Sequence, residues 1–201
     1  QERVDQAIRN GSERVTLPAG THRVDRSLTI RGAKNLTVDG NGADLVITRH
    51  THGIQVLDSR NVHIRNLSID YDPLPFTQGI VVEKAPDHSW LDVRLHEGYP
   101  AAGALQTIGE IDWAYPFLAD SRHWKPDVEH IHLRTCTDTE PGRVRIVPTG
   151  YGQKMQVGDL VALVLRTPGH SIRFGHSTAT RLTDVAMFAS PGITVISRAV
   201  G

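Results

Sequence analysis

Two stretches of the chain decide its fold: GIQVLDSRNVHIRNLSID at 53–70 and SIRFGHSTATRLTDVAMF at 171–188. Aligned without gaps, they repeat one apolar pattern, in which Ser59 also matches Ser177 and only Val62 meets a polar residue, Thr180. The matched apolar pairs are Ile54 with Ile172, Val56 with Phe174, Ile64 with Leu182, Leu67 with Val185 and Ile69 with Met187. Short aliphatic and β-branched runs broken by turn residues predict strands rather than helices.

The pattern also occurs before residue 53. Apolar residues at 28, 30, 36 and 38 match those at 54, 56, 62 and 64, and Asn35 matches Asn61. After the glycine-rich loop 40–43 the spacing shortens, and we match Leu45 with Leu67 and Ile47 with Ile69. Repeats of about 22 to 26 residues without a helix predict the stacked coils of a parallel β-helix. We expect Asn35 and Asn61 to form a side-chain ladder at a coil corner.

Both ends of the repeat region carry signals of their own. Residues 2–10 place apolar side chains at helical spacing before Gly11, which predicts a helix that caps the first coil. GITVIS at 192–197 starts another strand, after which no capping segment follows. We therefore expect missing C-terminal coils, or an oligomer, to cover this end.

Residues 71–169 separate the matched coils and are too long for a structureless loop. Five runs within them are longer than the coil strands, and most alternate apolar with polar residues, which predicts a small antiparallel sheet or barrel. The runs are 79–84, 90–96, 128–134, 142–148 and 158–166. The stretch 97–127 lacks this pattern but is rich in aromatic residues, so we expect an irregular binding segment there.

Composition excludes several classes of function. The 201 residues include 22 Lys and Arg against 22 Asp and Glu, a balance that does not suit a nucleic-acid-binding protein. No apolar run approaches the length of a membrane span, so no membrane partner is expected. Cys136 is the one cysteine, which leaves no intrachain disulfide and no cysteine-built zinc site.

Two carboxylates at the end of a coil strand are the first candidate site. Strand alternation turns Ser68 and Asp70 outward, and Asp72 follows two residues later. Such a pair suits a shared cation or acid and base roles. The alternative is that Asp72 with Pro73 only starts a turn and that Asp70 is a solvated residue at the strand end.

The inserted segment supplies further candidates. Trp113, Tyr115 and Trp124 suit stacking on sugar rings, although aromatic residues also fill cores. Arg166 and His170 stand where the chain returns to the coil, as ligand contacts or as ordinary hinge residues. Two His-x-His pairs, at 50–52 and 130–132, lack a third ligand at a recognisable spacing, so neither a metal nor another cofactor is expected.

Several segments together resemble glycoside hydrolase family 110, the α-1,3-galactosidases. The most specific is IDYDPLPFTQG at 69–79, which is followed by an insert and a resumed coil; the others are LPAGTHRV at 17–24, NLTVDGNGADLVIT at 35–48 and VGDLVALVLR at 157–166. The resemblance implies metal-independent, inverting hydrolysis of terminal α-1,3-linked galactose. It covers only the N-terminal part of the family's β-helix, and the family's catalytic aspartates lie on later coils, so no catalytic residue is transferred. Asp70, Tyr71, Asp72 and Gln78 match the family's pattern as positions that line the site.

The expected fold is all-β: a right-handed parallel β-helix with an inserted small antiparallel β-barrel or sheet and a short N-terminal capping helix. The expected domains are coils with the cap at 1–70, the insert at 71–169 and a resumed coil at 170–201. We predict part of an inverting exo-α-galactosidase that acts on an oligosaccharide or glycan, secreted or periplasmic. The alternatives are a polysaccharide lyase or epimerase on the same scaffold, or a non-catalytic glycan-binding, tailspike-like module. The predicted substrate-binding residues are Asp70, Tyr71, Asp72, Gln78, Trp113, Trp124 and Arg166.

Overall fold

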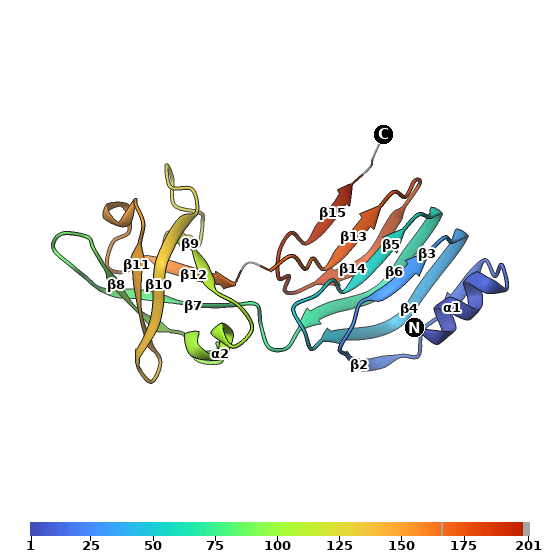
Figure 1. The fold of residues 1–201 in the computed structure, drawn as a ribbon, viewed down its shortest axis with the longest axis horizontal. Helices are drawn as coiled ribbons and strands as arrows, with labels where there is room; N and C mark the ends of the chain where they lie inside the picture. The colour runs from blue at the N-terminus through green and yellow to red at the C-terminus, as the bar shows by residue number, and fades with distance from the viewer. Residues whose placement is uncertain (166, 199–201) are drawn as a thin grey trace. The chain divides into compact units, whose positions relative to one another are not determined.

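A computed structural model describes residues 1–165 and 167–198. The chain divides into two compact units (Figure 1). One unit combines Gln1–Asp72 with Thr167–Gly201, and the other is the continuous segment Pro73–Arg166. The borders therefore fall after residue 72 and after residue 166.

The first unit is a parallel β-helix, as the repeats predict. Its elements are α1 (Glu2–Arg9), β1 (Arg14–Thr16), β2 (Gly20–Val24), β3 (Leu28–Arg31), β4 (Lys34–Ile47), β5 (Ile54–Leu57), β6 (Arg60–Tyr71), β13 (Ile172–Gly175), β14 (Arg181–Met187) and β15 (Val195–Arg198). One parallel sheet has the order β1-β4-β6-β14, with β2 also paired to β4, and the other has the order β15-β13-β5-β3 (Figure 1).

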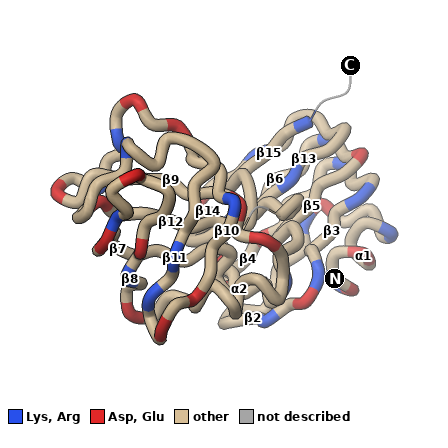
Figure 2. Tube along the Cα trace, turned by 60° about the vertical axis from the view of Figure 1, so that its left-hand side comes forward, with Lys and Arg blue, Asp and Glu red and all other residues tan. Residues whose placement is uncertain are grey.

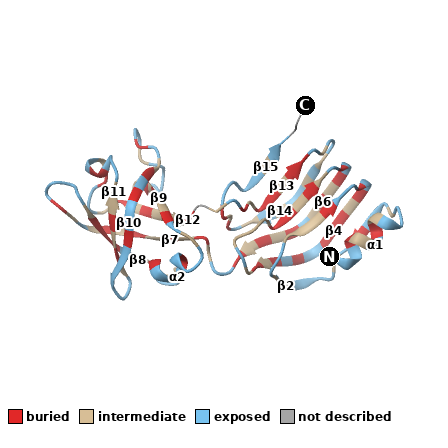
Figure 3. Ribbon diagram, viewed as in Figure 1, coloured by how far each residue is buried: buried red, intermediate tan, exposed pale blue. Residues whose placement is uncertain are grey.

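The register of these sheets confirms most of the predicted repeat. Ile54 lies between Leu28 and Ile172, and Val56 lies between Ile30 and Phe174. Further along the coil, β6 pairs with β14 at the predicted positions, Ile64 with Leu182, Leu67 with Val185 and Ile69 with Met187. The inward side chains of β5 and β6 are buried, and those facing outward are more exposed (Figure 3). Stacked apolar rows therefore form the interior of the coils.

Two predicted matches are each wrong by two residues. Leu45 pairs with Ile69 rather than Leu67, and Ile47 pairs with Tyr71 rather than Ile69. The shift arises at a bend after Asp39, beyond which Ala43 takes the inward position beside Leu67. Because side chains alternate with a period of two, a slip of two residues leaves the same side chains inward, and the pattern alone did not reveal it.

The bends between coil strands stack as well. Asn35 and Asn61 both have left-handed backbone conformations, with φ near 55°, and the amide of Asn61 donates a 2.8 Å hydrogen bond to Asn35 Oδ1. This confirms the predicted ladder. At the neighbouring bend, Gly40 leaves no room for a side chain, since an added Cβ would lie 2.4 Å from Leu67 Cβ and from the Asn66 carbonyl oxygen.

The helix α1 covers the start of the stack. Val4 and Ala7 are buried, and α1 contacts β1 and β4. The side chain of Gln1 also pairs with Thr29 of β3 through two hydrogen bonds, one to its carbonyl oxygen at 2.8 Å and one from its amide at 2.9 Å. Because β3 is an edge strand of its sheet, the backbone groups of Thr29 on its open edge have no strand to pair with. The side-chain amide of Gln1 satisfies them instead.

At the other end of the coils, β15 pairs in parallel with β13, Ile172 lying beside Val195. The strand begins three residues later than the predicted start at 192. The last described coil keeps several large apolar side chains exposed, namely Phe188, Ile193 and Val195.

The second unit is a closed antiparallel barrel in the order β10-β11-β8-β7-β12-β9. Its elements are β7 (Phe76–Lys84), β8 (Leu91–Leu95), α2 (Ala102–Gln106), β9 (Ile111–Phe117), β10 (Ile131–Glu140), β11 (Arg143–Pro148), the 3-10 turn η1 (Gly152–Lys154) and β12 (Leu160–Leu165). Its interior is a separate apolar core that includes Leu91, Ile146 and Leu163. Cys136 lies in this core, where burial raises the pKa of its thiol to about 12, so the thiol is not reactive.

The sequence analysis missed two elements of this unit, β9 and the short helix α2, both within 97–127. The irregular segment expected there contains a barrel strand instead. In β9 the bulky Trp113, Tyr115 and Phe117 are half-exposed, while Ala114 and Pro116 are buried. The large residues therefore face outward and the small ones inward, which reverses the usual strand pattern and hides it from a periodicity search.

Candidate functional site

The strand end that carries Asp70 lies in the β-helical unit. Asp70 is half-buried on the outer side of β6, between the inward residues Ile69 and Tyr71. Its Oδ1 accepts a 2.8 Å hydrogen bond from the backbone amide of Tyr71. In the adjacent strands, Val46 and Arg23 occupy the same row of the sheet. The outward direction predicted for Asp70 is confirmed.

Asp72 lies just beyond the strand and is paired with a cation. Its Oδ2 is 2.8 Å from Arg23 Nη1, and both side chains are about 60% exposed. Its backbone amide donates to the carbonyl oxygen of Ile47, which continues the ladder of β4. An exposed ion pair of this kind contributes little to stability, so Arg23 and Asp72 can each leave the pair and bind a ligand at little cost in stability.

Tyr71 does not lie where the sequence analysis places it. Its side chain is 2% exposed, inside the coil rather than in an open site. Its hydroxyl lies 2.9 Å from the Thr51 carbonyl oxygen and 3.2 Å from that of His170, and burial raises the pKa of the phenol. Tyr71 therefore ties two turns of the coil together, and a contact with substrate does not fit this position.

A second candidate surface is the outer face of the barrel strands β7, β12 and β9. Their pairing aligns outward side chains in three rows. The rows are Phe117 with Leu160 and Ile80, Tyr115 with Ala162 and Gln78, and Trp113 with Val164 and Phe76. Two predicted site residues, Gln78 and Trp113, thus lie on one face, in neighbouring rows.

Two histidines lie beside Trp113 on this face: His132 in β10 and His130 just before β10. The ring of Trp113 lies 4.0 Å from that of His130 and 3.9 Å from that of His132, measured between centroids. The histidines of this His-x-His pair are therefore neighbours of an aromatic surface. No group of three or more His, Cys, Asp or Glu side chains suited to a metal occurs within the described ranges 1–165 and 167–198.

Trp124, which follows the loop after β9, adds a further ring to the aromatic residues of β9. Its ring lies edge-on to those of Tyr115 and Phe117, at 5.1 and 5.8 Å between centroids. Its indole Nε1 donates to the Val128 carbonyl oxygen, and 45% of the residue is exposed. Half-exposed aromatic rings held at fixed angles suit contact with the apolar faces of sugar rings.

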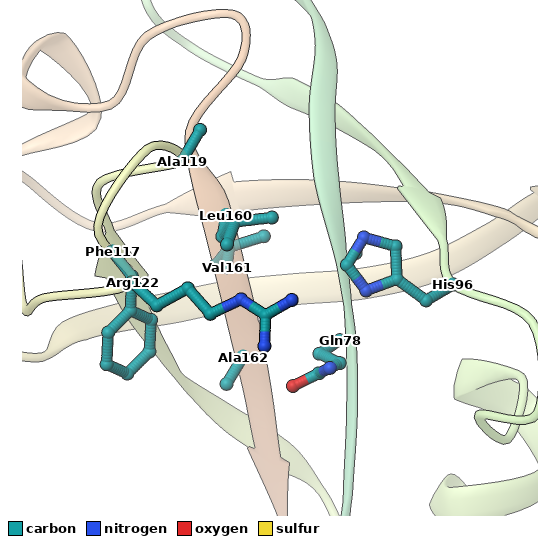
Figure 4. Close-up of a pocket in the computed structure, with 9 residues that line it drawn as sticks. Gln78, His96, Phe117, Ala119, Arg122, Leu160, Val161 and Ala162 are labelled. Carbon is teal, nitrogen blue, oxygen red and sulfur yellow. The ribbon is translucent and has the colours of Figure 1, made fainter.

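Beside these rings the same barrel face has a pocket of about 440 Å³. Its polar side chains are Gln78, His96 and Arg122, and its apolar ones include Phe117 and Leu160 (Figure 4). The pocket exists because Ala162, the smallest side chain of its row, lies between Tyr115 and Gln78. A concave apolar surface with a few polar groups is typical of small-ligand sites.

The sequence analysis missed Arg122, His96 and Ala162. They come from a loop, from the residue after β8 and from β12, and only barrel closure brings them together. The one available signal was the alternation of Trp113, Tyr115 and Phe117, which marks a strand with an aromatic side. The predicted Arg166 lies outside the described residues.

In the part of the chain that is described, no helix is long and apolar enough to cross a membrane.

Comparison with known proteins finds several relatives that share one name, Alpha-1,3-galactosidase B. The chain is 27% identical to Alpha-1,3-galactosidase B of Bacteroides thetaiotaomicron over 182 residues, 82% of this chain and 29% of the relative. It is 27% identical to the protein of that name from Phocaeicola vulgatus over 187 residues (85% of this chain, 31% of the relative). For the Bacteroides fragilis protein the identity is 25% over 187 residues, with 85% and 30% covered.

The chain thus spans about a third of the length of these relatives. No protein-family model matches it. The resemblance to α-1,3-galactosidases stated from the sequence is confirmed, and it extends over most of the chain, including the β-helical coils and the barrel.

Proposed function

We propose that this chain is part of an exo-acting, inverting α-galactosidase that removes terminal α-1,3-linked galactose from a glycan. The observation that carries the proposal is the similarity to proteins named Alpha-1,3-galactosidase B over 82–85% of the chain, on a parallel β-helix. Inversion requires two carboxyl groups about 6.5–9.5 Å apart, one as acid and one as base for water. We assign no such pair to this chain, whose relatives are about three times longer.

Within this proposal the described residues contribute binding rather than bond cleavage. The half-buried Asp70 and the exposed pair of Asp72 and Arg23 offer charged groups at one strand end of the coils. The barrel face with Trp113, Tyr115 and Trp124 offers aromatic rings for a sugar. Both arrangements suit hydroxyl groups and the apolar ring faces of a neutral saccharide.

The test is an assay of galactose release from an α-1,3-galactoside. It uses this sequence and, where the natural protein is longer, the whole natural protein. We expect free galactose whose first-formed anomer is β, as followed by proton NMR before mutarotation. An α anomer would contradict inversion, and no release by the whole protein would contradict the hydrolase.

A companion variant tests the aromatic face. Trp113→Ala removes one stacking ring, and we expect KM for the glycan to rise about fivefold while kcat stays unchanged, since stacking contributes about 1 kcal/mol. Tyr151→Ala is the matched control, because Tyr151 is an aromatic residue of the same unit that is 60% exposed. Equal KM values for the wild type and Trp113→Ala would exclude this face from substrate binding.

The lyase or epimerase and the non-catalytic binding module are outcomes of the same assay. Unsaturated or epimerised products would indicate the first, and glycan binding without any product would indicate the second. We also propose that the protein is secreted or periplasmic, where free glycans are encountered; fractionation of the producing cells tests this.

A further inference from the structure

The pocket on the barrel contains a cation that has no counter-ion. Arg122, an exposed loop residue, lines this pocket, and no ion pair within the described residues involves it. None of the pocket's lining residues is acidic; its polar side chains are an amide, an imidazole and this guanidinium. Elsewhere on the barrel Arg143 and Arg145 are both paired with Asp92. Arg94 and Arg134 form no ion pair within the described residues either, but they do not line this pocket. Basic and acidic residues are interspersed along both units (Figure 2).

The loop that carries Arg122 is held in place by several contacts. The backbone amide of Arg122 donates to the Leu118 carbonyl oxygen at 2.8 Å, and that of Leu118 donates to His123 at 2.9 Å. A bridge between Phe117 and Trp124 closes the loop, and Lys125 anchors its far side through an ion pair with Asp159. The loop backbone therefore needs little further ordering when the exposed side chain of Arg122 binds a ligand.

The other polar groups of the pocket face the same space. Gln78 comes from β7 and points toward Arg122, beside Ala162 (Figure 4). His96 lies on the other side of β7 (Figure 4), and its backbone amide donates to the Gln78 carbonyl oxygen at 3.0 Å. The ring of Phe117 forms an apolar wall beside Arg122 (Figure 4).

We propose that this pocket binds an acidic sugar, a monosaccharide unit that carries a carboxylate or a sulfate ester. The planar guanidinium of Arg122 takes the anionic group with two parallel hydrogen bonds. Gln78 and His96 bind neighbouring hydroxyl groups, and Phe117 packs on the apolar face of the ring. The glycan nature of the ligand rests on the proposed function, whereas its negative charge rests on the unpaired Arg122.

All residues that line the site belong to the barrel unit, whereas Asp70 belongs to the coil unit. The site therefore gives the protein a preference for glycans with an acidic sugar in addition to the terminal galactose. The volume of about 440 Å³ suits one or two sugar units rather than a longer chain.

Isothermal titration calorimetry with the whole chain tests the proposal. The probes are methyl β-glucuronide for the carboxylate, galactose 6-sulfate for the sulfate ester, and methyl β-galactoside as the neutral reference. We expect at least one acidic sugar to bind about tenfold more tightly than the neutral sugar, and less tightly as NaCl is raised. The two acidic probes decide between carboxylate and sulfate.

Two variants locate the binding. Arg122→Gln should reduce the preference for the acidic sugar to less than about twofold, and Arg134→Gln, an exposed arginine of β10 outside the pocket, should leave it unchanged. Ala162→Phe fills the pocket from an outward position and should abolish binding of all three probes, with folding checked by circular dichroism.

Equal affinity for acidic and neutral sugars, or an unchanged preference in Arg122→Gln, would overturn the proposal, as would no binding at up to about 50 mM ligand. These outcomes are independent of galactose release. A hydrolase that lacks the acidic-sugar preference would refute only this inference, and acidic-sugar binding without hydrolysis would refute only the proposed function.

Discussion

At the scale of single residues, two histidines connect successive coils. His52 Nδ1 accepts a 3.0 Å hydrogen bond from the His170 backbone amide, and His170 Nδ1 accepts one of 3.1 Å from that of Ile193. The two rings lie 5.2 Å apart. A nitrogen that accepts a hydrogen bond carries no proton, so both rings are neutral in the folded protein. Burial accordingly lowers the pKa of both residues, that of His52 to about 4.

This arrangement predicts a pH-dependent stability. The His52 imidazole is protonated at about pH 6.5 in the unfolded chain but only near pH 4 in the folded protein. Its contribution to the unfolding free energy is therefore complete above pH 6.5 and is lost as the pH falls to 4. We expect a loss of about 3 kcal/mol in unfolding free energy over this range, measured by urea denaturation. His52→Asn should flatten the curve, and His123→Asn, at an exposed loop position, should not. An unchanged curve for His52→Asn would contradict the assignment.

The buried phenol of Tyr71 predicts a simpler effect. In Tyr71→Phe the carbonyl oxygens of Thr51 and His170 lose their shared donor, and the unfolding free energy should fall by about 1 kcal/mol. Chemical denaturation measures this change, with Tyr151→Phe, at a 60% exposed position, as the control. A stability loss in the control as large as in Tyr71→Phe would count against the role of these hydrogen bonds.

At the scale of elements, the bends of the coil are as regular as its strands. Asn35 and Asn61 take the left-handed conformation at one corner, and Ala179 takes it at the corresponding position of the next coil, with φ of 54°. Asparagine tolerates this conformation, whereas alanine pays a steric penalty of about 1–2 kcal/mol. The corner is therefore well adapted in two coils and strained in the third.

Ala179→Asn should consequently stabilise the protein. The substitution relieves the backbone and extends the ladder by one amide, with an expected gain of about 0.5–1 kcal/mol and a higher thermal midpoint. Differential scanning calorimetry measures it. The control Ala186→Asn, at an exposed position within β14, should give no gain; a similar gain there, or none at 179, would contradict the interpretation.

Elements also show how far the sequence determines the structure. The stacked rows were predictable because the same apolar spacing recurs, and Ile54 does pair with Ile172. The bend after Asp39 was misplaced because a two-residue slip preserves alternation, and β9 was missed because its bulky residues face outward. The pocket was not predictable, since Arg122 and Ala162 meet only through tertiary pairing.

At the scale of the whole molecule, two units have separate apolar cores. Ile64 is fully buried in the coils and Ile146 in the barrel. The barrel is formed by one continuous segment, whereas the coil unit is assembled from residues on both sides of it. Each core is thus a cooperative region of its own.

Core substitutions should therefore act locally. Ile146→Ala should destabilise the barrel by about 2–5 kcal/mol and leave the coils unchanged, and Ile64→Ala should do the reverse. Hydrogen exchange followed by mass spectrometry reports peptides of each unit separately. Faster exchange in both units for either variant would show that the two cores unfold together.

The bends of the β-helix have a consequence for how such a molecule changes over evolutionary time. Between Asp39 and Ala43 strand β4 contains two more residues than the paired part of β6, and every inward row is still kept. After Asp72 an entire barrel is inserted, and β13 then resumes the register of β5. Sequence length is thus nearly unconstrained at such bends as long as the parity of each strand survives. A lineage of these proteins can acquire, exchange or lose a ligand-recognition module there in one genetic event, while the scaffold beneath it remains the same.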